Sequence, residues 1–128
     1  MSASLAVQAA LRTALAGIAP VFDAVPVAAP APYLTIGPDS VTDWSTKTTR
    51  GREHRVLIGV WDDAPGRARV KTLLAQVEAA VLGMGGVGGG VRIAHVLFVR
   101  SFVERDPGPD SGGWSHGVAD FRIRSEEI

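Results

Sequence analysis

Cysteine is absent from this sequence, and so is an excess of charge of either sign. Without cysteine the chain forms no disulfide and offers no thiolate to a metal, which fits a reducing compartment. The 128 residues carry 13 basic and 13 acidic side chains, so the formal net charge is zero. This balance argues against a protein dedicated to binding nucleic acid or a membrane surface.

Long apolar runs are also lacking. The most apolar N-terminal stretch, Leu5 to Ala19, is interrupted by Gln8, Arg12 and Thr13, and no basic region precedes it. We therefore expect neither an export signal nor a membrane span. The length predicts one domain with a single core.

The best-specified stretch is a strand that turns into a helix. His54 to Trp61 is mostly β-branched or aliphatic and closes on an aromatic, which predicts a central strand. Asp62 and Asp63 end that strand and suit the positive end of a helix dipole. Proline favours the first turn of a helix, so we expect the helix to begin near Ala64 or Pro65.

This main helix has one apolar stripe and ends at Gly83. The stripe consists of Val70, Leu73, Leu74, Val77 and Val81. Burying these side chains against a sheet contributes roughly 1.5–3 kcal/mol each, more than helix propensity supplies. The sheet is therefore expected to stabilise the helix.

Before this unit the sequence predicts a helix, an extended piece, a connector and a short strand. Ser2 or Ser4 caps the first helix, which ends before Gly17 and Pro20. Its apolar face comprises Val7, Leu11, Leu15 and Ile18. The later pieces are an extended stretch at 21–26, a proline-rich connector at 27–32 and a strand at 33–36.

Two polar segments are expected to protrude as loops, 37–53 and 105–114. The first is longer than a hairpin turn needs, and loops of that length are usually functional or disordered. Val41 and Trp44 lie in it without an obvious place inside the monomer.

Two further strands are predicted, Val91 to about Val103 and Ser115 to Arg124. The first is apolar on both faces: Val91, Ile93, Leu97 and Val99 on one, and Val96, Phe98 and Phe102 on the other. Helices on one side, and another subunit on the other, would cover such a strand. The last strand alternates between an apolar face (Ala119, Phe121, Ile123) and a polar one (His116, Asp120, Arg122, Arg124).

Together these elements predict an α+β fold. We expect a mostly antiparallel sheet of about four strands, with two helices packed on one face, in a single domain.

Three patterns that resemble chemical motifs are set aside. Gly83, Gly85 and Gly88 have the dinucleotide-binding spacing, but a helix precedes them and a strand follows, the reverse of what a pyrophosphate site needs. His54 and the other two histidines, His95 and His116, lie on different predicted strands without local ligand spacing.

The helix-start aspartates, Asp62 and Asp63, have a simpler role in capping than in general-acid chemistry. No serine lies in a nucleophile elbow. We expect no enzyme, no catalytic residues, no cofactor and no metal.

A modest basic run beside a tryptophan is the best candidate for an interface. Tryptophan and arginine are the residue types that anchor protein contacts, whereas a basic run alone is usually a solvated face. The predicted interface residues are Trp44, Lys47, Arg50, Arg52 and Trp114.

In its order and spacing of motifs, the chain resembles a known family. The segments are FDAVP at 22–26, APYLTIG at 31–37, VLIGVWDDAPGRA at 56–68 and HGVADFRIR at 116–124. Together, with the alanine-rich N-terminal helix, they are similar to the tail terminator or tail-completion (head-tail joining) proteins of long-tailed phages, above all the version in gene transfer agents. The resemblance covers nearly the whole chain.

The resemblance implies a non-enzymatic virion structural protein at the head-tail junction of a phage-like particle, assembled in the host cytoplasm. Such proteins form a ring, typically a homohexamer, that terminates the tail tube. The implied partners are further copies of the chain, the tail tube protein and the head-completion (stopper) protein. DNA would pass through a central channel without sequence-specific binding, and no membrane is involved.

One alternative of a different class stays open at this point. A monomeric small-ligand-binding domain, or a small enzyme of unknown substrate, would need a pocket that joins the glycine stretch to the histidines.

Overall fold

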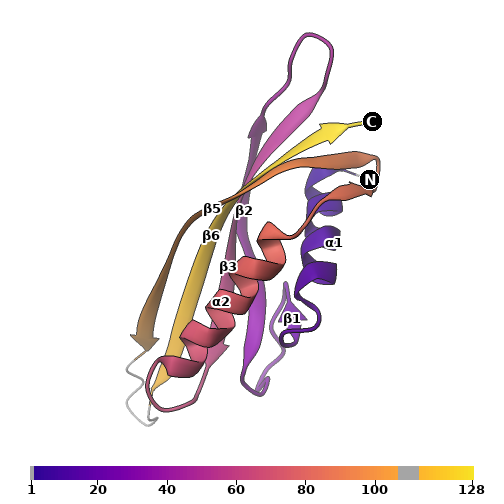
Figure 1. Ribbon diagram of the computed structural model, residues 1–128. Helices are drawn as coiled ribbons and strands as arrows, with labels where there is room; N and C mark the ends of the chain where they lie inside the picture. Colours follow the sequence, from indigo (N-terminus) through magenta and orange to yellow (C-terminus); the bar gives the residue numbers. More distant parts are fainter. Residues whose placement is uncertain (1, 107–112) are drawn as a thin grey trace.

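The computed structural model describes residues 2–106 and 113–128, which form a single α+β domain. Its elements are α1 (Ala3–Leu15), β1 (Val21–Phe22), β2 (Tyr33–Asp43), β3 (Gly51–Asp62), α2 (Ala68–Leu82), β4 (Gly86–Gly88), β5 (Val91–Asp106) and β6 (Trp114–Glu127). Both helices lie on one side of a curled sheet, as predicted, and none of the described elements covers the other side (Figure 1).

The described sheet has six strands in the order β1-β2-β3-β6-β5-β4, not about four. The four long strands pair antiparallel, as does β4 with β5, while β1 runs parallel to β2. The two additional strands are only two and three residues long. Segments this short cannot display an alternation of apolar and polar residues, so the pattern in the sequence did not reveal them.

Strand β2 continues well beyond its predicted end at Ile36. The register shifts between Ile36 and Asp39, and pairing then resumes with Asp39 opposite Val56. Gly37, with a φ of 117°, provides the backbone conformation that this irregularity needs. The predicted loop 37–53 is therefore wrong in its bounds, because only residues 44–50 connect β2 to β3. Most of the other predicted loop, 105–114, lies outside the described residues.

Strand β5 changes its facing pattern twice along its length. Register shifts between Ile93 and His95 and between Phe98 and Arg100 each move the following residues to the other face. Hence the predicted division of its apolar residues into two faces was wrong. Val96 and Phe98 lie opposite core residues of β6, and Leu97 and Phe102 lie opposite residues on the uncovered face.

The core lies between the two helices and the covered face of the sheet. All five residues of the predicted α2 stripe are buried, which confirms that stripe. Helix α2 begins at Ala68, however, and not near Ala64 or Pro65, and it has no side-chain cap and no acidic residue in its first turn. The aspartates that were expected to cap it, Asp62 and Asp63, therefore do not do so.

Helix α2 approaches the sheet most closely at Gly117 of β6. A Cβ added there would lie 2.8 Å from Leu74 Cδ1 and 3.0 Å from Val70 Cγ2. The missing side chain therefore lets the helix pack directly on the strand backbone.

Helix α1 is capped by Ser2, whose side chain accepts a hydrogen bond from the Leu5 N–H at 3.1 Å. Three of its four predicted apolar residues, Val7, Leu11 and Leu15, are buried within it. The fourth, Ile18, follows the end of the helix and packs against the core. The described residues include no helix that is both long and apolar enough to cross a membrane.

Candidate interaction surfaces

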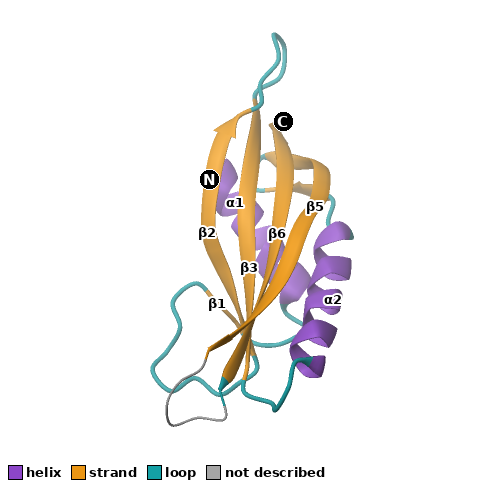
Figure 2. Cartoon of the chain, turned by 90° about the vertical axis from the view of Figure 1, so that its left-hand side faces the viewer, coloured by secondary structure: helices purple, strands orange, loops and turns teal. Residues whose placement is uncertain are grey.

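We call the side of the sheet that the helices leave uncovered the open face (Figure 2). Its residues alternate with the core residues along each long strand, except at the bulges in β2 and β5. The predicted two faces of the last strand are confirmed, because Ala119, Phe121 and Ile123 are buried in the core. The polar residues of that strand lie on the open face with side chains from β2, β3 and β5.

One end of the open face carries an aromatic cluster, formed by Tyr33, Trp61, Trp114 and His116. The Trp61 and His116 rings stack with centroids 3.7 Å apart. Tyr33 lies 6.4 Å from Trp61 and 6.0 Å from Trp114. Burial of His116 in this stack lowers its pKa, and the nearby Glu104 carboxylate opposes that effect.

Between this cluster and the opposite end lies an arginine ladder, in which four arginines share two carboxylates. Asp120 lies 2.8 Å from Arg55 Nη2 and 3.8 Å from Arg100 Nε. Glu53 lies 3.0 Å from Arg124 Nε and 3.7 Å from Arg122 Nε. The hydrogen bond to Asp120 raises the pKa of Arg55. These six side chains hold one another in place and together carry two excess positive charges.

The hairpin loop at 44–50 projects beyond the sheet at the other end (Figure 2). Trp44, at its base, is half-buried. Its ring lies 5.8 Å from the His95 ring, and the Arg124 guanidinium lies over it at 5.1 Å. The expectation that Trp44 has no place inside the monomer is therefore wrong.

The five predicted interface residues do not form one patch. Lys47 is exposed in the hairpin loop, Arg50 lies 3.8 Å from Glu127, and Arg52 donates a hydrogen bond to Asp43 at 3.2 Å. Trp114 lies in the aromatic cluster at the opposite end of the sheet. Whether any of them contacts a partner stays a prediction.

The three histidines lie in three different environments. His54 is buried, and its Nε2 lies 2.9 Å from the Ser125 hydroxyl, while His95 and His116 contact different tryptophans. Burial lowers the pKa of His54. In the part of the chain that the structure describes, no three histidine or acidic side chains are grouped as metal ligands.

The glycine stretch after α2 is not followed by a helix. Gly83 ends α2, and Gly86–Gly88 forms the short edge strand β4. These glycines line a recess of about 480 Å³ against small α1 residues such as Ala6 and Ala10, and none of the histidines lines it. The pocket joining glycines and histidines that the ligand-binding alternative needs is not formed there.

Asp62 is buried and has a different role from the helix capping that the sequence predicts. It is fully buried at the end of β3, with Arg69 Nε from the first turn of α2 3.3 Å from its Oδ1. The geometry is that of an ion pair without a directed hydrogen bond. Asp62 therefore ties the strand to the start of α2 through a side chain and does not cap the helix backbone.

The feature that sequence reasoning missed is the free edge of β5. Strand β4 pairs only with Val91–Ile93, so from Ala94 to Glu104 no described strand lies beyond this edge. Four large apolar side chains are exposed along it: Leu97, Phe98, Val99 and Phe102. The high density of apolar residues in this stretch of the sequence indicates an apolar surface. The sequence does not reveal the two bulges, which decide which of these side chains are exposed.

Buried residues thus hold the sheet and helices together, and the exposed apolar and aromatic residues form surfaces suited to contact with other macromolecules, as expected of a component of a larger assembly. Comparison with protein families gives the same class. The chain belongs to the tail completion protein gp17 family, whose model matches residues 1–126. It is therefore a tail component of a phage-like particle.

Among solved structures the chain is similar to a chain of the "Virion of native gene transfer agent (GTA) particle". The TM-score is 0.83 at 31% sequence identity, and the match covers 98% of each chain. Comparison with curated proteins found no match.

Proposed function

We propose that this chain forms a ring, a hexamer by its family resemblance, that terminates the tail tube and joins it to the head-completion protein. DNA passes through the centre of the ring. The observation that carries the proposal is that, among the described residues, most of β2 and most of β5 have no strand on their outer sides, in a chain that belongs to the tail completion family.

A ring needs two different surfaces on each subunit, one on each side. The described part of β2 from Ile36 to Asp43 has no strand on its outer side, because β1 pairs only with Leu34 and Thr35. The other edge of the same sheet is the free edge of β5. Contacts between unlike surfaces run head to tail and close into a ring when the rotation divides the circle.

The charge distribution is compatible with a DNA channel. With 13 basic and 13 acidic residues, the chain has no excess of cations to hold each passing phosphate. In the arginine ladder, carboxylates already neutralise part of the guanidinium charge. DNA is therefore expected to slide and not to bind at fixed sequences.

The mass of the protein in solution tests the ring. Light scattering over a range of concentrations should give a mass near six chains. If the protein is a monomer throughout, binding to purified tail tubes is measured next, because a ring can also close on the tube. A monomer that does not bind tubes contradicts the proposal. Calorimetric binding of a nucleotide or a divalent metal would then favour the ligand-binding alternative.

A further inference from the structure

We propose that the subunit contact is formed by inserting Val27, at the tip of the loop between β1 and β2, into a groove at the free edge of β5 in a second copy. This inference rests on the proposed ring and names the surfaces that close it. From here on, the connector means the whole loop between β1 and β2, residues 23–32, of which the sequence predicts only 27–32 as a connector. The groove between α2 and β5 is called the β5 groove.

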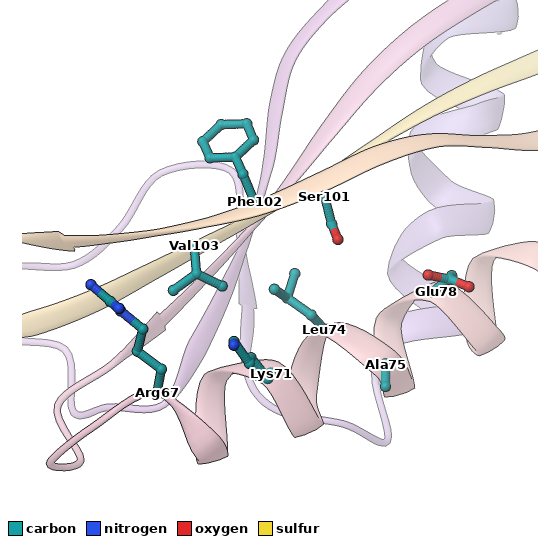
Figure 3. A pocket seen from close by; sticks show the side chains of 8 residues that line it. All are labelled: Arg67, Lys71, Leu74, Ala75, Glu78, Ser101, Phe102 and Val103. Carbon is teal, nitrogen blue, oxygen red and sulfur yellow. The ribbon is translucent and has the colours of Figure 1, made fainter.

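The β5 groove has an apolar floor and a partly basic rim (Figure 3). Its volume is about 510 Å³, enough for a valine with its neighbours. Leu74 of α2 and Val103 of β5 point toward each other across it, and Phe102 points to the opposite side of β5 (Figure 3). An inserted segment would therefore cover the floor and approach the exposed side chains along the edge.

The connector offers a side chain that nothing in its own subunit covers. Val27 is 99% exposed, and Val25 is 43% exposed. The Ala29 N–H donates to the Pro26 carbonyl at 3.3 Å, which closes a turn with Val27 inside it. Ala28 has a φ of 59°, which is unfavourable for alanine. Such a conformation is most often maintained where a segment has a function.

The exposed apolar side chains are concentrated on the two edges of the sheet. The β5 edge carries four exposed apolar side chains: Leu97, Phe98, Val99 and Phe102. The β1–β2 edge carries three: Val25, Val27 and Val41. Exposing such residues in water is unfavourable, and contact between the two edges would bury both sets at once.

The connector and the β5 groove lie at the same level of the sheet. One row of paired residues runs across the sheet from Phe22 on β1 to Phe102 on β5. The residues between them in this row are Thr35, Gly59 and Val118. Phe22 immediately precedes the connector, and Phe102 lies at the groove. A closed ring needs its two contact surfaces at one height, since an offset would generate a helix.

Charge favours the same pairing. The connector begins with Asp23, whose carboxylate lies 4.0 Å from Arg12 of its own subunit and accepts a hydrogen bond from Gln8, but whose side chain is still 59% exposed to a second cation. Arg67 and Lys71 line the groove nearest the start of α2, with Glu78 at its other end. Opposite charges on two approaching edges steer the association and fix its direction.

Disulfide trapping tests the contact directly, because the native chain has no cysteine. We would combine Val27→Cys with Ala75→Cys, a small exposed residue of the groove, and oxidise the assembled protein with diamide. Val27 lies in the loop at the β1 edge of the sheet, and Ala75 lies on α2 in the groove at the opposite edge, so a disulfide between them must join two subunits. A ladder of linked chains up to the ring mass is expected. A mixture of the two single variants should give heterodimers.

The matched control pairs Val27→Cys with Val87→Cys. Val87 is 62% exposed on β4, at the same edge of the sheet but outside the groove. A ring that keeps its mass while the Val27/Ala75 pair stays unlinked overturns this inference and leaves the proposed ring intact. If neither light scattering nor tube binding shows assembly, the ring itself is refuted, and this contact with it.

A second variant removes the apolar contact without touching the fold. Val27→Asp should leave the circular dichroism spectrum of the folded chain unchanged, because Val27 is 99% exposed in the monomer. The concentration at which the ring half-dissociates should rise at least about tenfold, as for an anchor residue of an interface. Val87→Asp should change it by less than about twofold. Equal assembly of the two variants, or a loss of tube binding at unchanged ring mass, contradicts the inference.

Discussion

The two faces of the sheet differ in what stabilises them. On the covered face, Phe121 and Ile123 are fully buried under the helices, and the contacts are apolar. On the open face, neighbouring strands are joined by stacked aromatic rings and by arginine–carboxylate pairs that remain partly exposed. Burial of apolar surface contributes far more to folding than partly solvated ion pairs do. The covered face therefore accounts for the fold, and the open face keeps its side chains ordered for contact.

The largest effect is expected from Phe121→Ala. The ring is fully buried on the covered face and lies 5.9 Å from the Phe98 ring. Its removal should lower the free energy of unfolding by about 3–5 kcal/mol, measured by urea denaturation. Phe102→Ala at the free edge is the control and should cost about 1 kcal/mol or less. Equal losses of unfolding free energy in the two variants would show that the covered face and the free edge of β5 contribute equally to stability.

Gly117→Ala tests how closely α2 packs on the covered face. The new methyl group would meet Leu74 and Val70 at 2.8–3.0 Å, so the helix must move outward. We expect a loss of about 1–3 kcal/mol in the same assay. Gly85→Ala is the matched control, since nothing lies within 4 Å of its added Cβ and its φ is not positive. An unchanged free energy of unfolding in Gly117→Ala would mean that α2 can move away from β6 without loss of stability.

Asp120→Asn breaks the centre of the arginine ladder on the open face. Asp120 is 7% exposed, but its partners Arg55 and Arg100 are 41% and 68% exposed, so solvent screens the pairs. We expect a loss of roughly 1 kcal/mol, which should shrink in 1 M salt. The exposed Asp63→Asn should have no effect. If Asp120→Asn lowered the free energy of unfolding as much as Phe121→Ala, the open face would contribute to folding as much as the covered face, contrary to our interpretation.

The smallest effect concerns His54, a polar residue on the covered side of the sheet. Burial lowers its pKa, so below the usual value of about 6.5 the unfolded chain binds a proton that the folded chain does not. Stability should therefore fall as the pH drops below about 6.5 and be unaffected by this group above it. The melting temperature between pH 7.5 and 5 measures the effect. His54→Asn should reduce the slope, and His116, whose pKa burial also lowers, should account for part of what remains.

The sequence alone predicted the parts of the molecule in which a local pattern reflects burial. The α2 stripe, the two faces of β6 and the placement of the helices on one side follow from periodicity, because one side of each element must be apolar to be buried. The family also followed, from motifs whose order and spacing fit few other chains. The predicted interface residues, Trp44 among them, remain untested as contacts.

Only the tertiary structure decided which exposed residues lie together. Bulges in β2 and β5 reversed the alternation that the sequence suggests, strands β1 and β4 formed without a pattern of their own, and Asp62 paired with Arg69 in place of capping a helix. Register and strand order place Phe22 and Phe102, 80 positions apart in the sequence, at one level on opposite edges. These are non-local properties, set by how strands pair across the whole sheet, and no window of neighbouring residues encodes them.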